Sequence, residues 1–408
     1  MSTSSAAPAA GWRTPMVVIL AGCAIAVIGF GIRSVFGFFL DPITEAQGWS
    51  RETFSIALSV QNLVWGLAAP VAGALADRYG PARVIVLGAL IFGAATWAMG
   101  VVDNSVLFTL VAGVAVGIGV AFTGFSLALA AMARVVPPHM RSLALGLGTA
   151  SGSLGQVIFA LGGQGAISLL GWQGALIALA ATAMAIIPLA FVLPKSNAGV
   201  GEIASNQSVG QALREAAGHR GYLLLTTGFF VCGFQIAFIT VHFPSYITDL
   251  GLSPWVAAWA WFLVGGCNIV GCMAAGWFGQ RWSKRCGLSG IYFARTLIMV
   301  ALLLAPKNAM TIYAFAIAMG FLWLATVPLT SGIVAQVFGV KYMATLFGVV
   351  FFSHQLGSFM GVWLGGWLYD RTGSYDIVWW ISAGLGLMAA LIHLPINEKP
   401  LARLHVAG

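Results

Sequence analysis

Twelve long apolar stretches make up most of this 408-residue chain, and most connections between them are short. A helix needs about 20 consecutive apolar residues to cross the hydrocarbon core of a bilayer. With 60% hydrophobic and only 7% charged residues, the chain does not have the composition of a water-soluble domain. The sequence therefore predicts an all-α membrane protein with twelve transmembrane helices. We expect these helices near residues 14–40, 51–76, 84–101, 106–133, 142–168, 173–193, 221–247, 254–280, 288–305, 310–338, 343–369 and 376–395.

One connection is much longer than the others. Residues 194–220 are polar, contain Ser, Asn and Gln, and carry acidic and basic side chains. Such a composition is typical of a linker outside the membrane. We therefore predict two pseudo-symmetric six-helix bundles, residues 1–193 and 221–408, joined by a linker at 194–220.

Positive charge is distributed unevenly between the two sides of the predicted membrane. If the N-terminus lies inside, most Lys and Arg side chains fall in cytoplasmic loops, and the outer loops hold only Arg51, Lys307 and Arg371. Cytoplasmic loops keep this excess, so both termini and the linker are predicted to be cytoplasmic in a multi-pass protein of the cell inner (cytoplasmic) membrane. Topology and contact with anionic lipid account for the formal charge of +8, so no nucleic-acid partner is expected.

The densest polar cluster lies at residues 73–83, between the second and third apolar stretches. The residues that define it are Gly73, Asp77, Arg78, Gly80 and Arg83. The cluster resembles the signature loop of the major facilitator superfamily, and a weaker copy without the acidic residue lies at 276–287. This resemblance implies two six-helix bundles that rock around a site at the membrane midplane. A carboxylate is favoured at a helix N-terminus, and the arginines can bridge to nearby helix ends. We predict that the loop is a cytoplasmic gating latch and not a substrate site.

Nearly the whole chain also resembles a bacterial branch related to the monocarboxylate transporters and oxalate/formate antiporters. The likeness is carried by residues 37–51, 268–271 and 365–373. Those transporters place an arginine in the eighth helix, whereas residues 254–280 carry no charge. The sequence therefore departs from the anion site of that design.

Ionisable residues inside a membrane span are costly and mark candidate functional sites. Arg33 lies in the first span and resembles the basic residue that monocarboxylate carriers hold there, so it is a candidate to bind an anionic substrate. The alternative is an arginine that reaches the outer headgroups or braces a helix. His242 and His354 are candidates to carry a proton or to be hydrogen-bonded core histidines. Arg295, in the ninth span, is expected outside the cavity, paired with backbone or reaching toward the membrane surface.

Uncharged polar residues lie on stripes of helices that line the cavity in this superfamily. They are candidates to bind a hydroxylated or amide-bearing solute, although Ser and Thr in such helices often join one helix to another. Phe36, Phe122, Phe238 and Trp323 are candidates for an aromatic cavity wall. The predicted polar substrate-binding residues, besides Arg33 and the two histidines, are Asn62, Thr123, Gln156, Gln235, Asn268, Thr326 and Gln355.

These features predict a secondary transporter, expected to be a monomer, that moves a small solute by alternating access. No carboxylate pair, metal-ligand cluster, activated nucleophile or nucleotide-binding loop is visible in the spans, so we expect no enzyme, cofactor or metal. Proton-coupled uptake of an organic carboxylate is the first hypothesis. The alternatives are uptake of a flat heterocyclic nutrient such as a riboflavin-like vitamin, and efflux of a metabolite.

Overall fold

The structure is a computed structural model, which describes residues 14–123, 127, 141–193, 208–339 and 342–401. The secondary structure of these residues is helical. The first half of the chain forms α1 (Pro15–Ser34), the 3-10 helix η1 (Phe36–Phe39), α2 (Leu40–Gln47), α3 (Arg51–Tyr79), α4 (Pro81–Ala98), α5 (Ser105–Phe108), the π-helix η2 (Thr109–Ala115), α6 (Val116–Phe122), α8 (Arg141–Met184) and α9 (Ile186–Ala190). The second half forms α11 (Arg220–Asp249), α12 (Pro254–Arg281), α13 (Lys284–Leu304), α14 (Ala309–Leu322), α15 (Thr326–Phe338), α16 (Met343–Thr372) and α17 (Asp376–His393).

Eleven helical stretches of the described residues are long and apolar enough to cross a membrane. One of them, Ala150–Ala190, has 41 residues, which at 1.5 Å per residue is about twice the hydrocarbon thickness. This stretch is interrupted at Gly171, where φ is 69° and ψ is 170°, a conformation that only glycine adopts easily. The interruption lies between the fifth and sixth predicted spans, so the structure agrees with twelve crossings.

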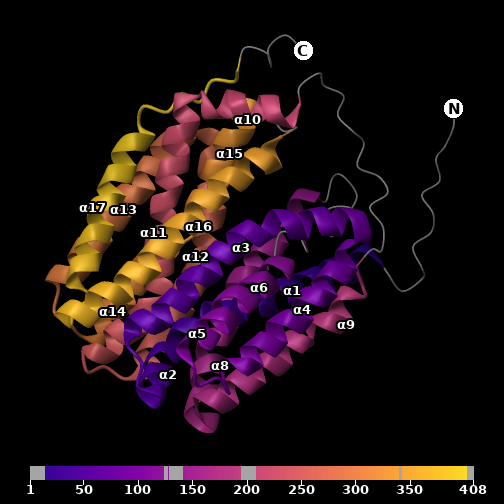
Figure 1. Cartoon of the computed structure of the whole chain (residues 1–408). Helices are drawn as coiled ribbons and strands as arrows, with labels where there is room; N and C mark the ends of the chain where they lie inside the picture. The colour runs from indigo at the N-terminus through magenta and orange to yellow at the C-terminus, as the bar shows by residue number, and fades with distance from the viewer. Residues whose placement is uncertain (1–13, 124–126, 128–140, 194–207, 340–341, 402–408) are drawn as a thin grey trace.

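The two halves of the chain lie side by side, with α3 and α16 in contact at their boundary (Figure 1). The halves also meet where α8 packs against α12 and where η1 packs against α11. Gly66 of α3 permits the close approach of α16, because a Cβ atom there would lie 2.9 Å from the Gln355 side chain. A continuous apolar core includes buried residues from both halves, such as Phe36 and Phe238.

The predicted linker contains a helix that the sequence analysis did not expect. Residues 208–217 include α10 (Val209–Ala217), which begins with reciprocal hydrogen bonds between Ser208 and Gln211. This helix packs against α11 and α16. Residues 194–207 lie outside the described part of the chain, so the division into two bundles and a linker stays a prediction at this segment.

Arg295 braces the break between α14 and α15. Its guanidinium donates to the carbonyls of Leu322 at 2.6 Å and Trp323 at 2.7 Å, and its side chain is fully buried. Carbonyls at a helix C-terminus have no partner within the helix, so Arg295 supplies one. Arg295 therefore has the backbone-binding role that the sequence analysis expected.

The bundle has two ends that are referred to below by the residues they carry. The motif end is where α3 ends and α11 begins, since residues 73–83 lie there. The Arg51 end is the opposite one, where α3 begins and α11 ends.

Candidate substrate-binding site

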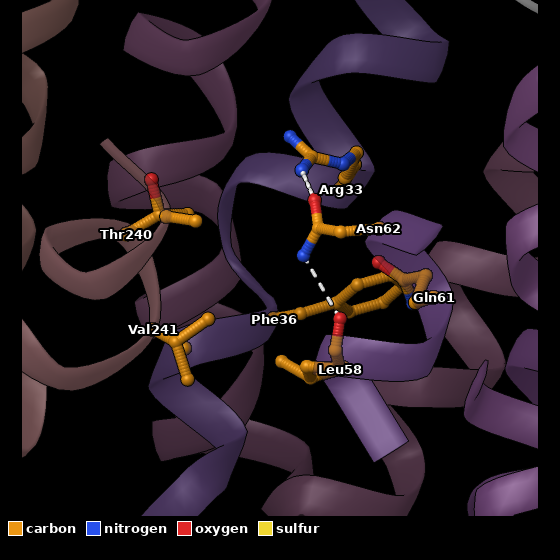
Figure 2. Close-up of a pocket in the computed structure, with 9 residues that line it drawn as sticks. Arg33, Phe36, Leu58, Gln61, Asn62, Thr240 and Val241 are labelled. Carbon is orange, nitrogen blue, oxygen red and sulfur yellow. Dashed lines mark hydrogen bonds between the residues drawn. The ribbon is translucent and has the colours of Figure 1, made fainter. Parts of the chain in front are cut away.

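A small cavity lies between the two halves, within the span (Figure 2). The space open to the centre of a water molecule is about 10 Å³, close to the minimum that holds one water. In this structure the cavity therefore has room for about one water molecule. It is lined from the first half by Arg33, Phe36, Gly37, Leu58, Gln61 and Asn62, and from α11 by Ala237, Thr240 and Val241.

Arg33 is the charged residue of this cavity. Its Nη2 donates to Asn62 Oδ1 at 2.5 Å, and Asn62 Nδ2 donates in turn to the carbonyl of Leu58 at 2.8 Å, as Figure 2 shows. The guanidinium carbon lies 4.5 Å from the ring centre of Trp65. The buried Nε has no hydrogen-bond partner among the residues that the structure describes. Among the described residues no carboxylate forms an ion pair with Arg33, so its positive charge is available to an anion.

A row of rings leads from Arg33 across the boundary between the halves. The Trp65 ring of α3 meets Phe351 of α16 edge-on, with centroids 5.4 Å apart. Phe351 stacks on His354 at 5.8 Å with planes 8° apart, and His354 lies 5.0 Å from Phe229 of α11. His354 is half-buried, and its Nδ1 lies 3.2 Å from Gln355 Oε1. The structure thus connects two predicted site residues, Arg33 and His354, through aromatic side chains.

Two glutamine side chains retain unused polar atoms. Gln156 is fully buried, and among the described residues neither its amide nitrogen nor its amide oxygen has a hydrogen-bond partner. Gln355 is also fully buried, and its Nε2 has no partner in the described part of the chain. Buried polar groups are normally satisfied, so these amides are candidates to contact a solute.

His242 is tied to the protein through both ring nitrogens. Its Nδ1 lies 3.1 Å from the Tyr375 hydroxyl, and its Nε2 lies 2.8 Å from the Val362 carbonyl. Because a carbonyl only accepts, Nε2 carries the proton and Nδ1 accepts from Tyr375. The side chain is fully buried, so in this state His242 is a hydrogen-bonded core histidine.

Four other predicted site residues are also bonded within the protein. Their substrate-binding role stays a prediction, but none of these bonds leads into the cavity beside Arg33. The contacts are Thr123 Oγ1 to the Gly119 carbonyl at 2.8 Å, Gln235 Nε2 to the Ser382 carbonyl at 2.9 Å, Asn268 Nδ2 to Ser153 Oγ at 2.9 Å, and Thr326 Oγ1 to Cys232 Sγ at 3.2 Å.

Asn268 joins three helices. Besides its bond to Ser153 of α8, its Oδ1 accepts from the backbone of Leu324, at the break between α14 and α15, at 3.0 Å. The aromatic candidates Phe238 and Trp323 are each only 1% exposed and pack edge-on against Trp379 and Trp261. Asn268, Phe238 and Trp323 therefore bind or pack against other helices of the protein.

The predicted gating residues lie at the motif end. Gly80 ends α3 and precedes α4 with φ 88°, so it forms the sharp turn between the two helices. Arg78 and Arg83 are exposed, and a Cβ atom at Gly73 would meet no atom within 4 Å. The side chain of Asp77 lies outside the described part of the chain. The latch therefore stays a prediction.

A cluster of charges at the Arg51 end joins the two halves, and the sequence analysis did not predict it. Arg51 donates through both terminal nitrogens to Asp249 of α11, at 2.6 and 2.7 Å, and its Nη2 lies 3.0 Å from Asp41. Its Nη1 also donates to the Tyr375 hydroxyl at 3.1 Å. Asp370 of α16 accepts from the backbone nitrogens of Arg51 and Glu52 at the start of α3. We call these residues the Arg51 latch: Asp41, Arg51, Asp249, Asp370 and Tyr375.

Comparison with known proteins bears on the same architecture. The family model described as Major Facilitator Superfamily matches residues 21–362. The chain belongs to this superfamily. Its members are transporters and not enzymes, so the prediction that the chain is not an enzyme is confirmed. This superfamily member is a multi-pass membrane protein.

The relatives described here share only low sequence identity with this superfamily member. It is 25% identical to monocarboxylate transporter 13 of Rattus norvegicus over 400 residues, 95% of this chain and 90% of the relative. It is 24% identical to the uncharacterized MFS-type transporter YcxA of Bacillus subtilis, over 91% of this chain and 92% of that protein. The crystal structure of a bacterial homolog of the human lysosomal transporter Spinster superposes with a TM-score of 0.76 at 16% identity, covering 96% of this chain and 99% of the other. The structural likeness confirms the fold.

Proposed function

We propose that this protein is a proton-coupled carrier that takes up a small organic anion, with a carboxylate held by Arg33. The observation that carries the proposal is a buried guanidinium at the boundary between the halves, bonded to Asn62 and lacking an anionic partner among the described residues. A carboxylate matches such a donor in charge and shape. Similarity to a protein named monocarboxylate transporter 13 supports the same substrate class.

We further propose that His354 carries the coupled proton. It is half-buried and is joined to Arg33 through Trp65 and Phe351, whereas both nitrogens of His242 are occupied. An imidazole changes charge near neutral pH, which suits a proton carrier. Because Trp65 and Phe351 connect His354 to Arg33, binding of the anion and of the proton would be coupled at this boundary, which would tie proton entry to substrate entry.

In the proposed cycle the two halves rock around this cavity, so that one end of the bundle opens while the other closes. The Arg51 latch, which holds the halves together at one end, supports this mechanism. We place the motif end and both termini in the cytoplasm of a monomer in the cell inner membrane, as the distribution of Lys and Arg indicates.

The test is uptake of radiolabelled propionate, lactate and benzoate into proteoliposomes, with and without an inward proton gradient. Loss of a two-bond charged contact costs about 3 kcal/mol, so Arg33→Gln should lower kcat/KM for a transported carboxylate about hundredfold, and Arg33→Lys less. Arg214→Gln, at an exposed arginine of α10 and outside both copies of the signature loop, is the matched control. Unchanged carboxylate uptake in Arg33→Gln would refute the anion site.

A second candidate is uptake of a flat, uncharged heterocycle such as a riboflavin-like vitamin. The observation that favours it is the buried amide of Gln156, which has both donors and acceptor unused and suits the edge of a heterocyclic ring. Gln156→Leu should then abolish uptake of labelled riboflavin, whereas Arg33→Gln should not. Efflux of a metabolite would use the same site with the gradient reversed.

A further inference from the structure

The rings beside Arg33 differ from the aromatic residues of the packed core. Phe36, Phe238 and Trp323 are each 1% exposed. Trp65, Phe351 and His354 are only half-buried, although they lie at the boundary where α3 meets α16. They therefore keep free ring surface at this boundary.

Trp65, the first of these three rings, lies against the charged group of Arg33. The Arg33 guanidinium lies over the Trp65 ring at 4.5 Å, so the face of the guanidinium is occupied and its N–H edge remains for a ligand. One edge position, Nη2, is taken by Asn62, and the buried Nε is unpaired. An anion that reaches this edge must lie next to Trp65, with Phe351 one ring further along.

We infer that the substrate is an aromatic or heteroaromatic carboxylate whose ring lies against Trp65 and Phe351 while its carboxylate meets Arg33. Aromatic rings prefer edge-on or offset contacts at centroid distances of about 4.5–7 Å, the geometry that Trp65 and Phe351 already adopt with each other. The ring and the carboxylate must be directly bonded or separated by a short link, because Trp65 touches Arg33 itself.

The ring contact also spans both halves of the protein. Trp65 belongs to α3, whereas Phe351 and His354 belong to α16, so a ring that lies against both Trp65 and Phe351 contacts the two parts that would move. A ligand stabilises the state in which its contacts are complete. Trp65 and Phe351 are thus specificity-determining residues for ring-bearing anions, separate from the charge of Arg33. This inference rests on the proposed function, since it assigns the rest of the solute that Arg33 would bind.

The experiment compares benzoate with cyclohexanecarboxylate, which has a similar size and the same charge but no aromatic ring. Wild-type protein in proteoliposomes should transport benzoate with a higher kcat/KM than cyclohexanecarboxylate. Trp65→Leu and Phe351→Leu should each lower this ratio about tenfold, and Trp65→Phe should keep most of it. The ratio is measured within one variant, and a thermal-unfolding midpoint for each variant checks that it is folded.

The outcomes separate the inference from the proposed function. Equal kcat/KM for the two acids in wild type, or an unchanged ratio in both leucine variants, overturns the ring site but leaves the anion carrier intact. Uptake of propionate and lactate without uptake of benzoate likewise overturns the ring site and leaves the anion carrier intact. A protein that transports none of these carboxylates overturns both proposals. A lowered ratio in the leucine variants, restored in Trp65→Phe, supports the ring site.

Discussion

The Arg51 end and the motif end of this bundle hold the two halves in different ways. At the Arg51 end, charged side chains cross from one half to the other, with Arg51 paired to Asp249 and Asp370 bonded to the start of α3. At the motif end, the described contacts of Lys284 and Arg285 stay within the second half, with Gln336 and with the carbonyls of Leu394 and Ile396. Among the described residues, charged contacts therefore join the halves at the Arg51 end, as expected of one state in a rocking mechanism.

Of the substitutions at the two ends, Arg51→Gln is expected to have the largest effect on how often the Arg51 end opens. The side chain of Arg51 is 14% exposed, and its removal leaves Asp249 and Asp41 without the cation that they pair with in this structure. Breaking a buried pair costs about 3–5 kcal/mol, and partial exposure lowers this to about 2 kcal/mol. We expect the Arg51 end to open at least about tenfold more often. The alkylation rate of Ser55→Cys, a buried position one turn into α3, measures this opening in a background without the native cysteines.

The matched control for this prediction is Arg371→Gln. Arg371 pairs with Glu52 across the same boundary at 3.3 Å, but its side chain is 51% exposed. Exposed pairs contribute about 0–1 kcal/mol, so the alkylation rate should change less than about threefold. Equal rates in Arg51→Gln and wild type would show that the latch does not hold this end closed.

A smaller effect of opposite sign is expected from Arg83→Gln at the motif end. Arg83 is exposed in this structure, so it contributes little to the state described here. If the motif residues hold their own end closed in the other state, their loss shifts the population toward the present one. Alkylation of Ser55→Cys should then slow about threefold, and transport should fall. Faster alkylation would contradict a latch at this end.

The sequence predicted the membrane spans because a helix in lipid needs a continuous local run of apolar residues. The interruption at Gly171 also follows from a local rule, whereas the carbonyls that Arg295 binds lie 27 and 28 positions away in the sequence. The Arg51 latch was missed because Arg51 and Asp249 are 198 positions apart in the sequence, and only the packing of the halves brings them together. Charges of opposite sign at span ends on one side, including Asp41 and Asp370, were the available signal.

The polar stripes did not predict which of their residues line the cavity beside Arg33. Thr123 satisfies its hydroxyl on the carbonyl four residues earlier in its own helix, as Thr commonly does in helices. Asn268 and Gln235 use their amides between helices. A sequence pattern identifies the face of a helix that avoids lipid, but it does not separate residues that meet a solute from residues that meet another helix. The sequence did not identify Trp65 as a site residue, because its proposed role depends on the position of Arg33 above its ring.

The smallest effect is expected from Tyr375→Phe. Burial raises the pKa of the Tyr375 phenol above its ordinary value, so the group stays protonated throughout the neutral range. It can therefore donate to His242 while it accepts from Arg51. The phenylalanine keeps the ring but removes both bonds, each worth about 1 kcal/mol, and Arg51 keeps Asp249. We expect alkylation of Ser55→Cys to rise only about twofold, equally at pH 6 and pH 8, because the folded-state phenol loses its proton only above its raised pKa. A variant effect that grows between pH 6 and pH 8 would instead show that a group titrating near neutrality, rather than the neutral phenol, controls closure at the Arg51 end.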